Sequence, residues 1–550
     1  MKLKHYLSLG AFVLGLSLVA CGQKPSPAPV IPDNFSDVTT FDEPLDAHSE
    51  DMINFWEYDG DYTTLTESTF RSLFHTDPEK SQSEGKTWEI EFTHDAEEAD
   101  EYAVEVALTE DFENAWEFPA KEGKATIQNL YVGETHYYRI KAMTGDEVEY
   151  SKAYTLETAD VGPRLMNIDG MTNCRDLGGK ITENGSKIRQ GLIYRTAALD
   201  DTISGSIITD VGRDTMLNFM GVKTEIELRG GPKGLGGEQN AKERPSLLND
   251  ESVTCHFNPM GYEGGKSPLF RNIIPVVHFF EHFAEEDFYP AFFHCRIGTD
   301  RTGFCSTLLN GLLGLSIEDC YRDYLFSNFG KIQKTSTIHQ NGADSPDGYI
   351  ADLLAWEGDT LQQKVYNFLR TIGVRQSTLE GILETLIDGE IPDLEGARKT
   401  ITMVTPSMEY AQSATWNRSE EFRSPTVYTT LPGNAEVYTT VTTEGAINSA
   451  SLYAMMSVRN TSSNAQSAFE VTIDGEQIAI PTTSFATTTS GFSTSEDFWI
   501  PLKLTDSLSI PAGSHVFKVK NKLSNVSMKI SHFAFAVEEN DSFTYPQVER

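Results

Sequence analysis

The sequence predicts a multidomain protein in which a central α/β domain lies between two all-β domains, each a β-sandwich. Its 550 residues are too many for one hydrophobic core, so about three domains are expected. Residues 86–158 and the region from 397 onward alternate apolar and polar positions between turns, which is typical of strands. Between these regions, an apolar run at 291–293 is followed by a helical pattern from Thr302, which indicates an α/β unit.

The start of the chain predicts export and a lipid anchor. Two early lysines precede an apolar stretch at 7–19 that is too short to span a bilayer comfortably. The motif LVAC, which ends at Cys21, resembles a bacterial lipobox, and the resemblance implies cleavage before Cys21 and lipid attachment to it. We therefore predict a signal peptide at 1–20, a lipidated cysteine with a proline-rich linker at 21–42, and a position on the outer side of a bacterial membrane. The alternative is an ordinary signal peptide that ends near a cysteine.

Charge and cysteine content limit the partners of the chain. The formal net charge of −37, from 81 acidic and 44 basic residues, argues against a nucleic-acid partner, because binding nucleic acid needs a basic face. Apart from Cys21, all five cysteines lie in the central region, unlike those of a disulfide-stapled secreted protein. We expect mostly free, buried thiols, with the hypothesis that Cys174 or Cys305 forms a reversible disulfide that protects Cys295.

Both flanking domains are predicted to be rich in strands. Residues 43–160 resemble a fibronectin type III sandwich, with 46–74 as a helix or an extra strand on that domain. Four residues are expected in its core or at a corner: Trp88, Tyr102, Leu130 and Tyr138. Residues 396–550 indicate a β-sandwich or jelly roll that loosely resembles carbohydrate-binding jelly rolls. Trp416 and Tyr428 either stack on a sugar or pack in the core, so this domain binds a glycan, binds a surface protein, or caps the central domain.

The ten residues from His294 to Gly303 read HCRIGTDRTG and carry the strongest chemical signal. A thiolate at Cys295 would attack phosphorus. A short loop lets backbone N–H groups point inward as an anion cradle, and Gly298 supplies backbone angles that a side chain would forbid. Arg301, six positions after the cysteine, offers a planar donor that matches two phosphate oxygens. A strand, a loop and a helix N-terminus together favour a bound anion.

This loop resembles the signature of the cysteine-dependent tyrosine phosphatases, and more narrowly that of the bacterial atypical tyrosine/serine phosphatases, HCxAGKDRTG. Other segments are similar to motifs of the narrower group. NCRDLGG at 173–179 resembles NFRDLGG, YRTAAL at 194–199 resembles FRSAAL, ELR at 227–229 stands where DLR is usual, and DYL at 323–325 matches. The resemblance implies a tyrosine-phosphatase fold for residues 161–395.

The sequence departs from this group at positions that bear on the substrate. Ile297 replaces an alanine, and Thr299 replaces a lysine that the group associates with activity on phosphoinositides. Arg296 supplies a different positive charge beside the cysteine, and Cys174 stands where phenylalanine is usual. The substrate class is therefore open between phosphoproteins and inositol phosphates.

Chemistry and the resemblance together assign roles to the loop. Cys295 is expected to be the nucleophile, and Arg301 to bind the phosphate and stabilise charge on the transferring group. Thr302 is expected to donate its hydroxyl to the cysteine sulfur, and His294 to order the loop and favour the thiolate. The other residues of the predicted phosphate-binding loop are Arg296, Ile297, Gly298, Thr299 and Gly303.

The general acid and the nearby arginines are less closely defined by the sequence. The resemblance implies that Asp300 is the acid, with Asp176 and Glu227 as alternatives. Asp300 is alternatively an ion-pair partner that orients the loop arginine. Three more arginines either line the site or pair with acids that support it: Arg175, Arg195 and Arg229.

Three functions remain open from the sequence. The favoured one is an exported phosphatase that acts on a phosphorylated protein or on a small phosphoester. In a protein the expected target is phosphotyrosine, with phosphoserine and phosphothreonine as alternatives. The second is an inositol-phosphate or phosphoinositide phosphatase. The third is a surface-binding protein with a vestigial phosphatase module, against which the intact loop argues. The predicted chemistry calls for no cofactor and no metal.

Overall fold

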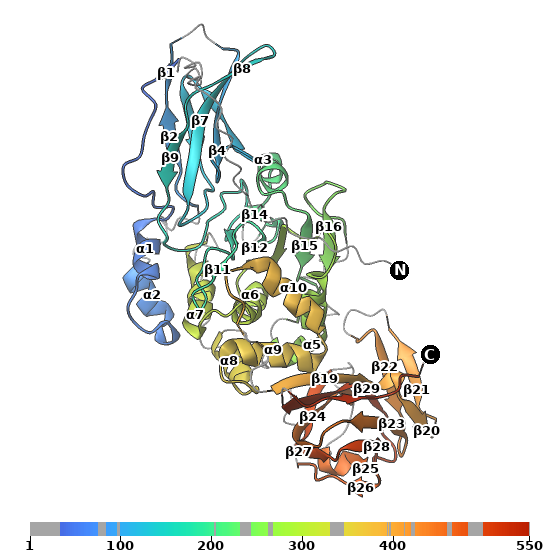
Figure 1. Ribbon diagram of the computed structural model, residues 1–550. Coiled ribbons are helices and arrows are strands. Elements are labelled where there is room, and N and C mark those ends of the chain that lie inside the picture. The colour runs from blue at the N-terminus through green and yellow to red at the C-terminus, as the bar shows by residue number, and fades with distance from the viewer. Residues whose placement is uncertain are drawn as a thin grey trace, which may run out of the picture.

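The computed structural model shows three folded parts along the chain (Figure 1). It describes residues 34–74, 84–95, 99–202, 205–230, 244–261, 268–330, 346–392, 394, 398–411, 413–419, 424–458, 465–481, 499–538 and 540–548. The predicted signal peptide, the lipidation site at Cys21 and most of the predicted linker lie outside these residues. None of the helices in the described ranges has the length and apolar character needed to cross a membrane.

The N-terminal part is an antiparallel β-domain whose sheet follows the order β2-β6-β5-β4-β7-β8, with β9 on β7. Its strands are β2 (Trp88–Glu91), β4 (Glu101–Ala107), β5 (Trp116–Lys121), β6 (Lys124–Ile127), β7 (Thr135–Thr144), β8 (Glu147–Tyr150) and β9 (Tyr154–Glu157), beside a short pair of β1 (Phe35–Ser36) and β3 (Thr93–His94). Leu130 and Tyr138 are buried in its core, whereas Trp88 and Tyr102 are half-buried against it. The likeness to fibronectin type III domains stays a prediction.

Two helices that precede this sheet pack with the central domain instead. These are α1 (Glu50–Trp56) and α2 (Glu67–Phe74), and their apolar residues belong to the central core. The Phe55 ring lies 5.5 Å from the Phe329 ring and 6.1 Å from the Phe326 ring, both in the central domain. The expectation that 46–74 belongs to the N-terminal domain is therefore wrong for these two helices, because the Phe55 ring is buried by residues about 270 positions away in the chain.

The central domain is built on a five-stranded sheet of order β10-β12-β17-β15-β16. Four strands run parallel: β12 (Ile193–Thr196), β15 (Thr224–Glu227), β16 (Thr254–Phe257) and β17 (Ala291–His294), while β10 (Arg175–Asp176) is antiparallel to β12. The carboxyl ends of parallel strands share one edge of a sheet, and Thr196 and Glu227 both lie opposite His294 there. The residues that follow these three positions are thus brought together.

Helices enclose this sheet, and the central one is α6 (Asp300–Leu312), every residue of which is buried. The others are α3 (Asp210–Asp214), α4 (Pro268–Arg271), α5 (Ile273–His282), α7 (Ile317–Leu325), α8 (Pro346–Leu354), α9 (Leu361–Ile372) and α10 (Gln376–Leu386). Short elements complete the domain: β11 (Lys187–Ile188), β13 (Asp200–Asp201), β14 (Ser206–Ile207), β18 (Ile387–Asp388), a 3-10 turn at Phe326–Phe329 and a π turn at Thr215–Phe219.

The boundaries of α9 follow from its sequence. The Thr360 hydroxyl accepts from the Gln363 backbone N–H, and the Gln363 side chain accepts from the Thr360 N–H, so the pair forms a capping box. The helix ends at Gly373, whose φ of 111° is a conformation that favours glycine.

The C-terminal part consists of two antiparallel six-stranded sheets. One contains β19 (Arg398–Val404), β21 (Thr415–Arg418), β22 (Val427–Leu431), β24 (Ile447–Val458), β27 (Ile500–Ile510) and β29 (Met528–Glu538). The other contains β20 (Glu409–Ala411), β23 (Glu436–Thr443), β25 (Phe469–Ile473), β26 (Glu476–Gln477), β28 (Gly513–Asn521) and β30 (Phe543–Thr544). Of the two aromatic residues that the sequence singled out, Trp416 is 41% exposed, whereas Tyr428 is half-buried with its ring 5.4 Å from Trp499.

The C-terminal sheets lie directly against the helices of the central domain, beside α8 and α9 (Figure 1). The buried His532 ring lies 2.9 Å from the Thr371 carbonyl oxygen, and the rings of Trp356 and Tyr453 stack with centroids 5.5 Å apart. Glu357 accepts a hydrogen bond from Ser451 in β24. These contacts join the two domains through buried groups from both.

Candidate active site

The predicted phosphate-binding loop connects the end of β17 to the start of α6. Cys295 directly follows the strand and is buried, and the connection ends at Thr299, the residue before α6. Gly298 has a φ of 71°, and a Cβ at this position would lie 2.5 Å from the Thr196 carbonyl oxygen. A side chain is therefore excluded both by the backbone conformation and by the neighbouring strand.

Support for the loop comes from two elements that lie far away in the sequence. The Asn173 side-chain amide donates to the carbonyl oxygens of Ile297, at 3.0 Å, and Gly298, at 3.1 Å. Arg195 Nη2 also donates to the Gly298 carbonyl oxygen, at 2.6 Å, and the Ala198 N–H donates to the Arg296 carbonyl oxygen at 3.0 Å. These hydrogen bonds thus fix three successive carbonyl groups of the loop, those of residues 296–298.

A buried carboxylate, Asp323 on α7, gathers the cations behind the loop. Its Oδ2 atom is 2.5 Å from Arg195 Nη1, and its Oδ1 atom is 3.3 Å from Arg175 Nε and 3.5 Å from Lys180 Nζ. Burial opposes the charge on Asp323, but the three cations outweigh it and lower its pKa far below the usual range. Of the two predicted roles, Arg175 and Arg195 therefore fit the supporting one.

His294 is held by two glutamates on the adjacent strand β15. Its Nε2 atom is 3.0 Å from Glu225 Oε1, and its Nδ1 atom is 3.7 Å from Glu227 Oε1. Arg244 bridges both glutamates, at 2.9 and 3.1 Å, and Arg229 pairs with Glu227 at 2.6 Å. These ion pairs occupy the carboxylate oxygens, so the cluster is a charge-compensated network that fixes the histidine beside Cys295.

This network makes Glu227 a poor candidate for the general acid. Burial opposes ionisation of Glu227, but His294 and Arg229 outweigh it and lower its pKa to about 2. A carboxyl group that stays ionised at neutral pH has no proton to give to a leaving oxygen. Arg229 also pairs with Asp200, at 2.7 Å, which fits its predicted supporting role.

Asp176, the other alternative acid, is bonded to groups outside the loop. Its carboxylate accepts from the backbone N–H groups of Gly178, at 2.8 Å, and Gly191, at 2.6 Å. It also lies 3.5 Å from Arg164, which donates to the Asn129 carbonyl oxygen of the N-terminal domain. The Asp176 carboxylate therefore stabilises a turn and a contact with the N-terminal domain, which is a structural role outside the proposed active site.

Asp300 and Arg301 form the first turn of α6 and are both buried. The Tyr324 hydroxyl donates to Asp300 Oδ1 at 2.9 Å, which fixes the carboxylate at the helix N-terminus. Thr302 is fully buried, and its hydroxyl oxygen has no hydrogen-bond partner within the described residues. Arg296 is 30% exposed and pairs with Asp201 at 3.3 Å, so the charge next to Cys295 is partly compensated.

The five cysteines of the described residues are free thiols. Burial raises the pKa of Cys174 to about 12 and that of Cys305 well above its usual value. Both thiols are therefore protonated at neutral pH, a state that makes them slow partners in disulfide exchange with Cys295. The proposed protective disulfide stays a hypothesis.

Sequence reasoning assigned no role to four supporting residues: Asn173, Glu225, Asp323 and Tyr324. Three of them lie inside segments that resemble family motifs, and that position could have drawn attention to them. Glu225 lies two residues before Glu227 on a strand, so both side chains face the same side of the sheet. This spacing could have indicated that Glu225 acts together with Glu227.

We predict that Gly298→Ala lowers kcat/KM by about 100-fold, because the strained backbone and the contact with the Thr196 carbonyl oxygen displace the loop. The measurement is hydrolysis of p-nitrophenyl phosphate together with a circular-dichroism melt. Gly381→Ala in α10 is the matched control, since no atom lies within 4 Å of its new Cβ, and it should leave the activity unchanged. Equal activity of the two variants would contradict the structural role of Gly298.

The central domain is similar to known tyrosine phosphatases. Residues 166–260 and 269–388 match the model of the tyrosine phosphatase family. A Cupriavidus necator protein named "Putative tyrosine-protein phosphatase" is 24% identical over 251 residues, which are 43% of this chain and 88% of that protein.

Among solved structures, carbohydrate-binding modules match parts of the chain with low TM-scores. A family 35 module from Clostridium thermocellum matches with a TM-score of 0.20 and 12% identity, over 25% of this chain and 97% of its own. A family 35 module from Cellvibrio japonicus matches with a TM-score of 0.20 and 8% identity, over 26% and 98%. The findings thus support the tyrosine phosphatase family, and with it phosphatase activity, for the central domain.

Proposed function

We propose that the central domain hydrolyses phosphomonoesters through a phosphocysteine at Cys295. The observation that carries the proposal is the position of Cys295 in a short loop between the central strand and the N-terminus of the buried helix α6. The Gly298 backbone, the two loop-supporting side chains Asn173 and Arg195, and the helix dipole favour an anion at this place.

The reaction divides into two transfers. The Cys295 thiolate attacks phosphorus and forms an S–P bond, while the P–O bond to the leaving alcohol breaks and Arg301 binds the phosphate oxygens. Asp300 gives its proton to the leaving oxygen, and its carboxylate then takes a proton from the water that attacks the S–P intermediate. Thr302 donates its hydroxyl, which has no hydrogen-bond partner in the described part of the chain, to the leaving sulfur in this second step.

Asp300 is the acid that the geometry supports best. Glu227 is committed to ion pairs and Asp176 to backbone N–H groups and Arg164, whereas Asp300 lies within the loop's own helix turn. The Tyr324 hydrogen bond orients its carboxyl group at the N-terminus of α6, next to Arg301.

For the substrate we propose a singly phosphorylated group, phosphotyrosine first. A polyphosphorylated inositol ring needs spare positive charge around the loop. Thr299 adds none, and Arg296 is paired with Asp201. Inositol phosphates and phosphoinositides are therefore the second candidate, and the substrate panel below distinguishes them.

We expect that Cys295→Ser reduces phosphate release by about 10³-fold or more while folding persists, because a serine hydroxyl in this place is not ionised at neutral pH. Release would be measured from phosphotyrosine and phosphoserine peptides, inositol phosphates and phosphoinositides, with vanadate as an inhibitor. Cys255→Ser, at a half-buried thiol outside the loop, is the control and should keep its activity. Activity that survives Cys295→Ser would refute the phosphocysteine mechanism.

We predict that Asp300→Asn lowers kcat for a phosphotyrosine peptide by about 10² to 10⁴-fold while KM changes little, because the amide cannot protonate the leaving oxygen. The loss should be smaller for an aryl phosphate with a strongly acidic leaving group, which departs without a proton. Asp176→Asn is the comparison and should spare kcat. An equal loss for both leaving groups would contradict the acid role.

We also propose that the chain is exported and carries lipid on Cys21, on the basis of its sequence alone. In a bacterial host fed labelled palmitate, the chain should incorporate label and enter the detergent phase, and Cys21→Ala should abolish both. Cys174→Ala is the control that keeps the label. Labelling that persists without Cys21 would contradict the anchor. Binding of a glycan or a surface protein by the C-terminal domain stays a prediction from sequence.

A further inference from the structure

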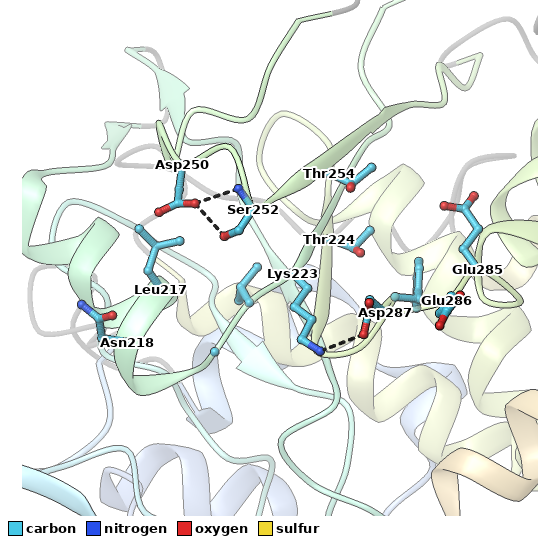
Figure 2. A pocket seen from close by; sticks show the side chains of 13 residues that line it. Leu217, Asn218, Lys223, Thr224, Asp250, Ser252, Thr254, Glu285, Glu286 and Asp287 are labelled. Atoms are coloured by element: carbon cyan, nitrogen blue, oxygen red, sulfur yellow. Dashed lines mark hydrogen bonds and ion pairs between the residues drawn. The ribbon is translucent and has the colours of Figure 1, made fainter.

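A pocket of about 450 Å³ lies at the edge of the central sheet opposite to the phosphate-binding loop (Figure 2). Its walls include Thr224 and Thr254, the first residues of β15 and β16, whereas the loop follows the last residue of β17. Three consecutive acidic residues after α5 also line it: Glu285, Glu286 and Asp287. This second hollow is therefore separate from the proposed active site.

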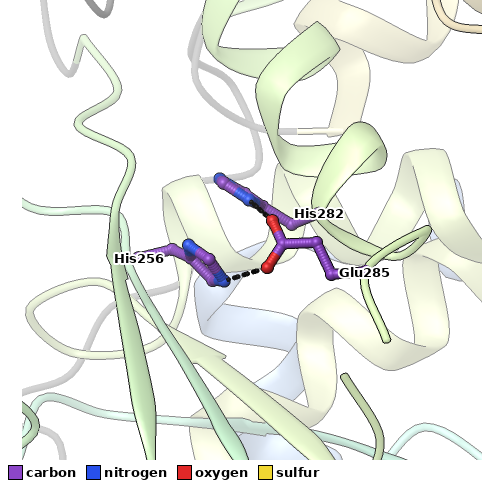
Figure 3. A group of neighbouring side chains, drawn as sticks. All are labelled: His256, His282 and Glu285. Atoms are coloured by element: carbon purple, nitrogen blue, oxygen red, sulfur yellow. Dashed lines mark hydrogen bonds and ion pairs between the residues drawn. The ribbon is translucent and has the colours of Figure 1, made fainter. Parts of the chain in front are cut away.

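Two histidines converge on one carboxylate beside this pocket (Figure 3). His256 lies on β16, His282 is the last residue of α5, and Glu285 follows three residues later. His256 Nε2 is 2.9 Å from Glu285 Oε2, and His282 Nδ1 is 2.7 Å from Glu285 Oε1. The two imidazole rings stack with centroids 3.8 Å apart.

We propose that His256, His282 and Glu285 bind one divalent transition-metal ion of the zinc class. Two imidazole nitrogens and a carboxylate oxygen form a donor set that suits this ion, and all three donor atoms lie within 4.8 Å of one another. Bonds of about 2.0–2.2 Å in a tetrahedron place donor atoms about 3.4 Å apart. Glu285 therefore needs to withdraw by roughly 0.5 Å, which its 44% exposed side chain permits, and the two stacked rings need to turn out of parallel so that both nitrogens point at one ion.

A further feature fits a bound cation. His256 Nε2 is buried and makes no aligned hydrogen bond within the described residues, although the carboxylate oxygen is close to it. Water or a group in the pocket would take the fourth position.

The ion would join the outer strand β16 of the sheet to helix α5. His256 lies opposite Ile226 on β15, between Glu225 and Glu227, which hold His294. A metal bonded to His256 and to His282 on α5 would fix β16 against that helix. We therefore assign the ion a structural role, with a gain in thermal stability as its first consequence.

The test uses the full chain carrying Cys295→Ser, because the active-site thiol would itself bind zinc. After removal of metal by a chelator, calorimetric titration with Zn²⁺ should show one site per chain. His256→Gln and His282→Gln should each weaken it by at least about 100-fold. Saturating zinc should raise the melting temperature of the parent by about 5 °C and leave that of the variants unchanged.

Two matched controls keep the site. Glu286→Gln removes the adjacent carboxylate of the same pocket, and His515→Gln breaks a histidine–carboxylate pair of equal length, 2.7 Å to Asp474, that has no second imidazole. Both variants should bind zinc as the parent does. Loss of binding in either control would overturn the assignment of ligands.

X-ray absorption of the zinc-bound parent decides the question even if a ligand variant fails to fold. We expect nitrogen and oxygen neighbours at about 2.0–2.1 Å and no sulfur at about 2.3 Å. The proposal is overturned by the absence of a stoichiometric site, by a sulfur neighbour, or by binding that survives in both folded histidine variants, as it would if zinc chose Glu225, Glu227 and His294 instead.

Discussion

The carboxylate of Asp323 is the constraint on which the candidate active site depends. Without it, Arg175, Arg195 and Lys180 would be buried cations that lack the one carboxylate with which each of them pairs in the described residues, a costly arrangement in a protein interior. Through Arg195 the same carboxylate reaches the Gly298 carbonyl oxygen and so fixes the loop that contains Cys295. The Asp323 carboxylate on α7 thus holds positively charged side chains behind a loop that is proposed to bind a phosphate group.

The parts of the site that sequence analysis could predict are those whose chemistry is local. Cys295, Gly298 and Arg301 stand within seven consecutive positions. The apolar run before them and the helical pattern after them predict the strand and the helix that β17 and α6 now display. The β-rich character of both flanks followed from alternation, which is also local. The comparisons support the family that the loop motif had indicated.

The remainder depends on contacts between distant residues, which a single sequence does not reveal. Glu225 meets His294 across 69 positions, and Asn173 meets Gly298 across 125. The choice among Asp300, Asp176 and Glu227 likewise depends on partners, because an ion-paired carboxylate and a hydrogen-bonding turn residue look alike in a sequence. Helices α1 and α2 were assigned to the wrong domain for the same reason, since their aromatic rings pack against residues near Phe329.

The docking of the C-terminal sheets on α8 and α9 has a geometric consequence. His532 is buried against Thr371, and Glu357 is bonded to β24, so the two domains share groups that separation would expose. The C-terminal domain is therefore held in a fixed position relative to the central domain. A surface bound by this domain would be held at one distance and one bearing from Cys295, and only phosphate groups that project to that distance would come within reach.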